Sequence, residues 1–138
     1  TPTLGLHQAR IARSGEEVTL ICYGPMVDTC LEAAKEASQE GRKLEVIDVR
    51  SLSPLDMATV YESVRRTTRA IVVQEAPRTQ GVGAEIAARL GEELYYVMEA
   101  PVLRVTGWST PYPPAKAEGE HIPDVDRILD AVDRSLAF

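Results

Sequence analysis

The chain has 138 residues, which is enough for one domain and too few for two ordinary ones. Its 15 Lys and Arg against 21 Asp and Glu leave a net charge of −6, which argues against a nucleic-acid binder because such proteins carry a basic surface. No apolar run approaches the roughly 20 residues that span a bilayer, and the sequence shows no signal-peptide pattern. We therefore expect a cytoplasmic domain with neither a nucleic-acid nor a membrane partner.

The two cysteines, Cys22 and Cys30, lie in a strand pattern and a helix pattern, and their spacing matches no zinc or redox motif. We expect them to be buried, reduced thiols. The two histidines, His7 and His121, are far apart in sequence and have no ligand-like neighbours, so we expect no metal site.

The first part of the chain alternates strand and helix patterns. Residues 9–13 predict an edge strand that is free to run antiparallel to its neighbour. Residues 18–23 form an apolar run typical of a strand buried on both faces. Pro25 suits the first turn of a helix that we expect to continue to Gln39, with Gly41 as the residue that closes it.

Residues 44–49 predict the next buried strand, and a helix is expected after it. Ser53 is a favourable N-cap for this helix, Pro54 a favourable first helical residue, and Asp56 stands at the position of a capping-box carboxylate. The predicted inner face of the helix consists of Met57, Val60, Tyr61 and Val64.

Three arginines, Arg65, Arg66 and Arg69, crowd the C-terminal end of this second helix. Cations are favoured there by the helix macrodipole. The alternative is that the three side chains form a phosphate site. We favour a solvated helix end over a phosphate site on the macrodipole argument.

A polar loop over residues 74–83 connects a buried strand at 70–73 to a helix at 82–94. In an open α/β sheet, the loop after a central strand lies at the carboxyl edge, where ligands and partners bind. Glu75 is an isolated candidate acid or base at this edge. However, no His or Cys stands near Glu75 in sequence, and Arg78 could pair with it.

Gly81 and Gly83 open the following helix and suggest a phosphate-binding loop. The dinucleotide fingerprint would need a third glycine at the position of Ile86, and the chain has no Walker sequence. We therefore favour a tight turn that lets strand and helix pack closely. No complete catalytic constellation emerges from these residue types, because a catalyst needs a base, an orienter and a charge stabiliser in mutual reach.

The last part of the chain contains a short predicted strand at residues 102–106 and a proline-rich segment at 108–123, expected to lie at the surface. Residues 125–136 predict an amphipathic helix. Its apolar stripe consists of Val125, Ile128, Leu129, Val132 and Leu136. Its acidic face consists of Asp124, Asp126, Asp130 and Asp133. The alternation of strands and helices predicts an α/β fold with a mainly parallel sheet and helices on both faces.

Seven segments, in order and over nearly the whole chain, carry a family resemblance. They are residues 17–24 (EVTLICYG), 45–56 (EVIDVRSLSPLD), 74–78 (QEAPR), 83–86 (GAEI), 100–107 (APVLRVTG), 110–113 (TPYP) and 122–124 (IPD). Together they resemble the C-terminal domain of transketolase-like thiamine enzymes, and specifically the β subunit of the decarboxylating component of 2-oxo acid dehydrogenases. The SLSPLD motif separates this group from transketolases proper, and EAPR and TPYP favour the branched-chain enzyme over the pyruvate one.

The resemblance implies a three-layer α/β/α sandwich with a mostly parallel, five-stranded mixed sheet, forming a single domain over residues 1–138. Residues 1–8 would be a linker from an absent N-terminal pyrimidine-binding domain. In this family, thiamine diphosphate and Mg²⁺ lie between that absent domain and the α subunit, and the activating glutamate is also in the absent domain. We therefore expect no catalytic, cofactor-binding or metal-binding residue here, and no activity from the isolated chain.

The resemblance also implies partners: the α subunit and a second β subunit of an α2β2 heterotetramer, and the acyltransferase core. From the resemblance, we assign the docking of the acyltransferase to Phe138 and its terminal carboxylate. The acidic face of the last helix would extend this site through Asp126, Asp130 and Asp133. The acyltransferase's binding domain is typically basic in this family, so opposite charges would steer the encounter.

Two further positions follow from the same resemblance. Glu75 and Arg78 are expected to face a neighbouring domain or subunit, and Gln74 replaces a histidine found in many relatives. The alternatives are a domain of a pyruvate or acetoin dehydrogenase β subunit, a stand-alone partner-binding module, and an independent nucleotide-binding domain that rests on Gly81 and Gly83 alone.

Overall fold

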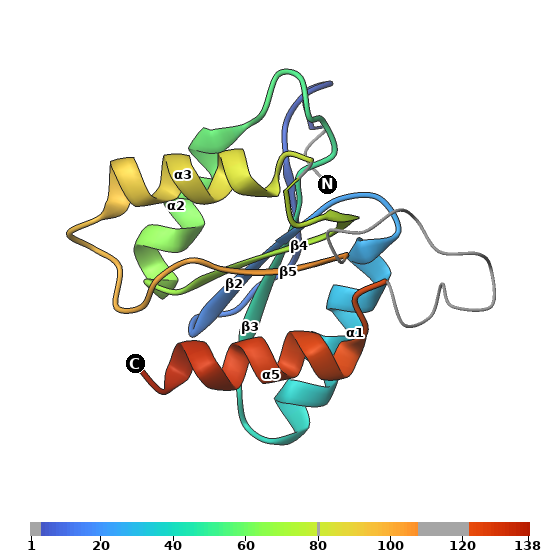
Figure 1. Cartoon of the computed structure of the whole chain (residues 1–138), viewed down its shortest axis with the longest axis vertical. Helices are drawn as coiled ribbons and strands as arrows, with labels where there is room; N and C mark the ends of the chain where they lie inside the picture. Colours follow the sequence, from blue (N-terminus) through green and yellow to red (C-terminus); the bar gives the residue numbers. More distant parts are fainter. Residues whose placement is uncertain (1–3, 80, 108–121) are drawn as a thin grey trace.

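The computed structural model describes residues 4–79, 81–107 and 122–138. Its elements, in chain order, are β1 (Arg10–Arg13), β2 (Val18–Cys22), α1 (Met26–Gln39), β3 (Leu44–Asp48), α2 (Met57–Thr67), β4 (Ala70–Pro77), α3 (Gly83–Leu94), β5 (Leu103–Gly107) and α5 (Val125–Leu136). Most of the proline-rich segment, and His121 with it, lies outside the described residues. Figure 1 shows the sheet between two helical layers, so the predicted three-layer α/β/α sandwich is confirmed.

The sheet has five strands in the order β1-β3-β2-β4-β5. The four strands β2 to β5 pair in parallel, whereas β1 runs antiparallel to β3 at one edge, as predicted. All residues of β2 are buried, because this strand lies between β3 and β4 and is covered on both faces. This position explains why its sequence is an apolar run and not an alternating one.

Successive residues of the central strands point to opposite faces and supply two separate cores. Leu20 and Ile71 pack with α1 and α5 on one face, where Ile128 is fully buried. Ile21 and Val72 pack with α2 and α3 on the other face. Each such side chain contributes roughly 1.5–3 kcal/mol of burial free energy. Among the described residues, no helix is long and apolar enough to cross a membrane.

The two cysteines are buried and unlinked, as predicted. The Cys22 thiol donates to the Ile47 carbonyl at 3.3 Å. A hydrogen bond with Cys30, together with burial, raises the pKa of Cys22 above its usual range. Its thiol is therefore protonated at neutral pH and is a poor nucleophile.

The start of α2 differs from its prediction, because Asp56 is the N-cap in place of Ser53. The Asp56 carboxylate accepts hydrogen bonds from the Thr59 N–H at 3.1 Å and from the Ala9 N–H at 2.9 Å. Ser53 lies instead in a turn closed by a β-bridge between Leu52 and Leu55. Both residue types are favourable caps. Asp56 also binds the segment that precedes β1, and this contact favours Asp56 over Ser53 as the N-cap.

Replacing Asp56 by Ala should lower the free energy of unfolding by about 0.5–2 kcal/mol at pH 7, whereas Ser53→Ala should change it by less than about 0.5 kcal/mol. Burial raises the pKa of Asp56, but hydrogen bonds from Thr59 and the Ala9 N–H outweigh burial, so its pKa lies below the ordinary value.

A carboxylate with a lowered folded-state pKa stabilises fully above its unfolded pKa of about 3.9 and loses this contribution as pH falls through the folded-state value. The stability difference between the wild type and Asp56→Ala should therefore narrow below about pH 4. Urea unfolding at pH 7 and pH 3 measures both effects. A larger cost for Ser53→Ala than for Asp56→Ala would contradict the assignment of the cap.

Candidate functional site

The loop that follows β4 is organised by the buried side chain of Gln74. Its Oε1 accepts hydrogen bonds from the Gly83 N–H at 2.8 Å and from the Tyr23 hydroxyl at 3.4 Å. Its Nε2 donates to the carbonyls of Pro77 at 3.1 Å and Ala76 at 3.4 Å. Gly83 is the first residue of α3, so Gln74 satisfies a backbone donor that a helix leaves free at its N-terminus.

The two glycines of this loop are required by how closely the backbone approaches Gln74. Gly81 has φ +80°, a conformation that residues with a Cβ rarely adopt, and a Cβ on Gly83 would lie 2.5 Å from Gln74 Oε1. This confirms the prediction that the glycines allow close packing. The Gly83 N–H, which a phosphate would use, is already bound within the domain.

Glu75 and Arg78 lie at the carboxyl edge of the sheet but form no ion pair with each other within the described residues. Glu75 is half-buried, and its charge, second to burial, raises the pKa of the Tyr23 phenol. Arg78 is exposed, and its backbone carbonyl accepts a hydrogen bond from Arg104 at 2.9 Å. Their expected contact with another domain or subunit stays a prediction.

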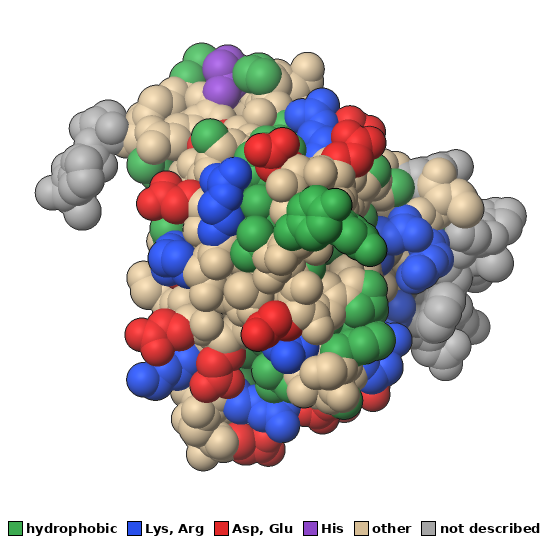
Figure 2. Space-filling view, turned by 90° about the vertical axis from the view of Figure 1, so that its left-hand side faces the viewer, with side chains coloured by type: hydrophobic (Ala, Val, Ile, Leu, Met, Phe, Trp, Pro, Cys, Tyr) green, Lys and Arg blue, Asp and Glu red, His purple; other side chains and the backbone are tan. Residues whose placement is uncertain are grey.

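Phe138 lies at the opposite, amino-terminal edge of the sheet, where β4 begins. Phe138 is 66% exposed and lines a mainly apolar cavity of about 550 Å³. Tyr95 lines the same cavity, and Tyr95 and Tyr96 are exposed and meet edge to face at 5.2 Å. We call Tyr95, Tyr96 and Phe138 the aromatic surface. Figure 2 views this side of the molecule and shows hydrophobic side chains set among charged ones.

The three aspartates predicted to extend the docking site do not form one cluster with Phe138. Asp133 forms an ion pair with Arg42, and Asp130 forms one with Arg134 at 3.2 Å. Asp126 lies near the start of α5 and lines a cleft of about 430 Å³ together with Arg78. The acidic face therefore runs along the helix from one edge of the sheet to the other, and two of its charges are already paired.

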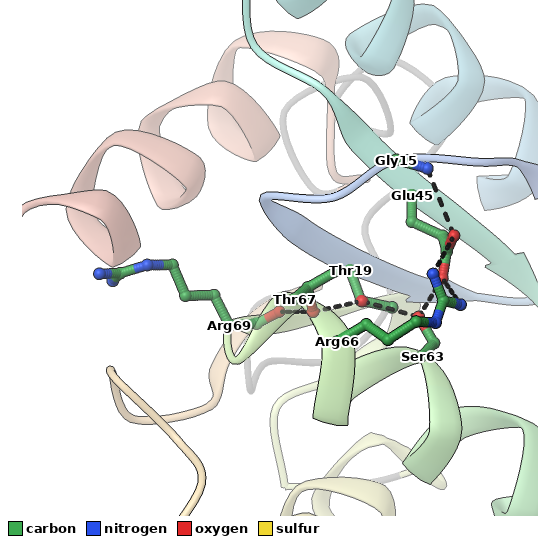
Figure 3. Close-up of polar contacts among 7 residues, drawn as sticks. All are labelled: Gly15, Thr19, Glu45, Ser63, Arg66, Thr67 and Arg69. Carbon is green, nitrogen blue, oxygen red and sulfur yellow. Dashed lines mark hydrogen bonds and ion pairs between the residues drawn. The ribbon is translucent and has the colours of Figure 1, made fainter.

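A buried polar cluster, which the sequence did not predict, connects β2, β3 and α2 (Figure 3). Its centre is the carboxylate of Glu45, a residue only 1% exposed. This carboxylate accepts hydrogen bonds from the Ser63 hydroxyl, from the Gly15 N–H at 3.3 Å and from the Arg66 guanidinium at 2.9 Å. The sequence signal that could have indicated this cluster is a glutamate inside an otherwise apolar strand.

The hydroxyl groups of the cluster continue away from Glu45. Thr19 hydrogen-bonds with Ser63 at 2.8 Å and with Thr67 at 2.7 Å. Because Ser63 gives its proton to Glu45, Thr19 donates to Ser63. The single Thr67 proton is then shared between Thr19 and the Arg69 carbonyl, which lies 3.1 Å from Thr67 Oγ1. These groups satisfy one another in the interior, and Glu45 is too buried to meet a substrate.

Two of the three arginines at the end of α2 fit the prediction of a solvated helix end. Arg65 fits it, with a side chain that is 52% exposed. Arg66 fits it as well, with a side chain that is 49% exposed, and it also compensates the buried charge of Glu45. Arg69 differs, because its side chain is only 13% exposed. Burial of a carboxylate favours a cation beside it, which explains the position of Arg66.

Among the described residues, no group of three His, Cys, Asp or Glu side chains is arranged to hold a metal ion. His7 hydrogen-bonds to the Ser51 hydroxyl at 3.2 Å. The described residues place Glu75 beside Tyr23 but bring no histidine or cysteine to it as a partner for acid–base chemistry.

The family of the chain follows from sequence comparison. A family model described as "Transketolase, C-terminal domain" matches residues 7–128. The chain belongs to the transketolase C-terminal domain family. A pyruvate dehydrogenase E1 component subunit beta of Leifsonia xyli is 54% identical over 98% of this chain and 40% of that protein. A 3-methyl-2-oxobutanoate dehydrogenase subunit beta of Mycobacterium tuberculosis is 49% identical over 98% of this chain and 38% of that protein.

Two solved structures share the fold of this chain. A structure described as "Split gene transketolase, inactive beta4 tetramer" has a TM-score of 0.83 and 28% identity, covering 97% of this chain and 43% of that one. A 2-oxoglutarate:ferredoxin oxidoreductase from Magnetococcus marinus, with a TM-score of 0.59 and 16% identity, shares the fold. This transketolase C-terminal domain spans about two-fifths of the β subunits it matches, and it is of the type found in 2-oxo acid dehydrogenases.

Within the transketolase C-terminal domain, replacing Gly83 by Ala tests the contact that organises the loop. The new Cβ would displace Gln74 Oε1, so we expect a loss of about 1–3 kcal/mol in the free energy of unfolding. Gly91→Ala, in the same helix, is the matched control, because a Cβ there meets nothing within 4 Å. That change should stabilise by up to about 1 kcal/mol. Equal stabilities of the two variants in urea unfolding would refute the constraint.

Proposed function

We propose that this domain belongs to the decarboxylating component of a 2-oxo acid dehydrogenase, where it supports subunit assembly and docks the acyltransferase core. The observation that carries the proposal is the aromatic surface beside an apolar cavity at the end of α5. Aromatic side chains in such positions are typical anchors of protein interfaces. The family and the β-subunit relatives support the same assignment.

We further propose that the whole enzyme binds thiamine diphosphate and Mg²⁺ through domains outside this chain. The described residues do not fit that group, because they contain no cluster of three metal-ligating side chains. The Gly83 N–H at the start of α3 is also unavailable to a diphosphate, since Gln74 accepts its hydrogen bond. The same contact argues against an independent nucleotide-binding domain.

The carboxyl edge of the sheet suits assembly with the α subunit and a second β subunit in an α2β2 heterotetramer of the cytoplasm. Arg78 is exposed there, and Asp126 lines the same cleft as Arg78. Mixed charges around this cleft favour a polar contact with a domain or subunit. The amino-terminal edge, with Phe138, is then left for the acyltransferase. This assignment gives the two edges different partners.

The preferred substrate class is a branched-chain 2-oxo acid, as the EAPR and TPYP motifs indicate. The Mycobacterium tuberculosis relative supports this preference, and the Leifsonia xyli relative supports the pyruvate alternative about as well. We expect the β subunit that carries this domain, assembled with its α subunit, to have a higher kcat/KM for 3-methyl-2-oxobutanoate than for pyruvate or acetoin.

Stopped assays of decarboxylation with thiamine diphosphate and Mg²⁺ measure kcat/KM for each of the three substrates. The isolated chain serves as the negative control and should release no CO₂ above background. A preference for pyruvate would replace the branched-chain assignment while leaving the enzyme class intact. Decarboxylation by the isolated chain would contradict the proposed location of the cofactor.

Docking is tested by Phe138→Ala in the assembled enzyme, titrated with the peripheral subunit-binding domain of the acyltransferase. Loss of an aromatic anchor should raise Kd by at least about tenfold. Leu6→Ala is the control, since Leu6 is also exposed but lies far from α5 along the chain and outside its cavity.

The aspartates should matter less for docking than Phe138. Asp130→Asn and Asp133→Asn should each raise Kd by less than about threefold, because both carboxylates are exposed and already paired with arginines. Unchanged affinity of Phe138→Ala would remove this surface as the docking site. The alternative of a stand-alone binding module predicts that the isolated chain binds the acyltransferase domain as tightly as the assembled enzyme does.

A further inference from the structure

Arg69 joins the turn between α2 and β4 to the last turn of α5. Its guanidinium donates hydrogen bonds to the Ser135 carbonyl and, at 3.5 Å, to the Phe138 carbonyl. The last carbonyls of an α-helix have no partners within the helix and carry the negative end of its macrodipole. A cation from a turn 66 residues earlier in the chain therefore caps α5 and holds the backbone of Phe138.

Arg69 is itself held at both ends. Its backbone carbonyl accepts the Thr19 N–H at 2.9 Å, which attaches it to the central strand β2. Its guanidinium lies 3.9 Å from the Glu99 carboxylate. Glu99 is fixed in turn by Thr68, whose hydroxyl donates to that carboxylate at 2.6 Å and whose carbonyl accepts the Glu99 N–H at 3.0 Å.

The buried polar cluster also holds the backbone of Arg69 in place. Figure 3 shows its hydrogen bonds running from Glu45 through Ser63, Thr19 and Thr67, with the Arg69 side chain extending away from the cluster toward α5. Buried, mutually satisfied hydrogen bonds resist rearrangement. Arg69 is thus attached to a rigid part of the domain and reaches the end of α5 from there.

We propose that Arg69 is a positioning residue that orders Phe138 for partner docking. This inference rests on the proposed docking function. Phe138 lies two residues beyond the end of α5 and is largely exposed, so packing alone does little to fix its side chain. Ordering such a side chain at the moment of binding costs affinity, and a pre-ordered one avoids that cost. Glu99 and Phe138 line the same cavity, so the ion pair with Arg69 also shapes the surface beside the anchor.

The test uses the full β subunit assembled with its α subunit, and the peripheral subunit-binding domain of the acyltransferase as the probe. Arg69→Gln removes the charge and the fork of donors, and calorimetry should show a Kd raised roughly five- to twentyfold. Arg65→Gln is the matched control, because Arg65 lies in the last turn of α2, where it pairs with exposed Glu93 at 3.6 Å and lies over the Tyr61 ring. That variant should change Kd by less than about twofold.

A double-mutant cycle separates positioning from a merely structural role. If Arg69 acts through Phe138, Arg69→Gln should add less than about twofold to the effect of Phe138→Ala. Hydrogen exchange of the amides of residues 135–138 should also become faster in Arg69→Gln while the rest of α5 keeps its protection. Additive losses, or unchanged exchange in this turn, would overturn the inference.

The outcomes also separate this inference from the proposed function. If Phe138→Ala leaves Kd unchanged, the docking function fails and the positioning role fails with it. If Phe138→Ala weakens binding but Arg69→Gln does not, only the positioning role is overturned. Should Arg69→Gln prevent assembly, Glu99→Gln takes its place, because the Glu99 side chain is 63% exposed and is not needed for the core. It should raise Kd about two- to fivefold, and only while Phe138 is present; unchanged binding would refute the inference.

Discussion

The arrangement of α2 and the turn after it depends on the buried carboxylate of Glu45. A charge that is removed from water must be matched by donors, and an unmatched one would cost several kcal/mol. Glu45 is matched by Ser63 and Arg66 from α2 and by the backbone of Gly15. These contacts set where α2 lies on the sheet, and they thereby place the turn after α2 that carries Arg69. A polar requirement of the interior therefore determines the geometry of an exposed surface.

The two edges of the sheet are used differently. In open α/β sheets, ligands usually bind outside the carboxyl ends of the strands. Here the Gln74 side chain accepts a hydrogen bond from the first N–H of α3, so this N–H is not free to bind a ligand. The exposed aromatic side chains gather at the other edge, beside Phe138. The fold is thus retained, while the helix N–H that could bind a small ligand at the carboxyl edge is already bound by the domain's own side chain.

Sequence patterns predicted most of the fold, because strands buried on both faces and amphipathic helices have strong periodic signals. They located α5 at its observed bounds and the antiparallel edge strand β1. They failed at Asp56, where two good caps stood three residues apart and a long-range contact to Ala9 decided between them. They also missed the roles of Glu45 and Arg69, because both depend on partners distant in the chain. The exposure of Phe138 is likewise a property of three-dimensional packing.

An amide side chain at position 74 makes the hydrogen bonds of this loop independent of pH near neutrality. Gln74 does not titrate, so its bonds to Gly83 and Pro77 are the same on either side of neutral pH. An imidazole in its place would have to present an unprotonated nitrogen to the Gly83 N–H, and it would lose this acceptor on protonation near pH 6.5. The hydrogen bond at the start of α3 therefore does not change over the pH range in which a histidine would change its protonation state.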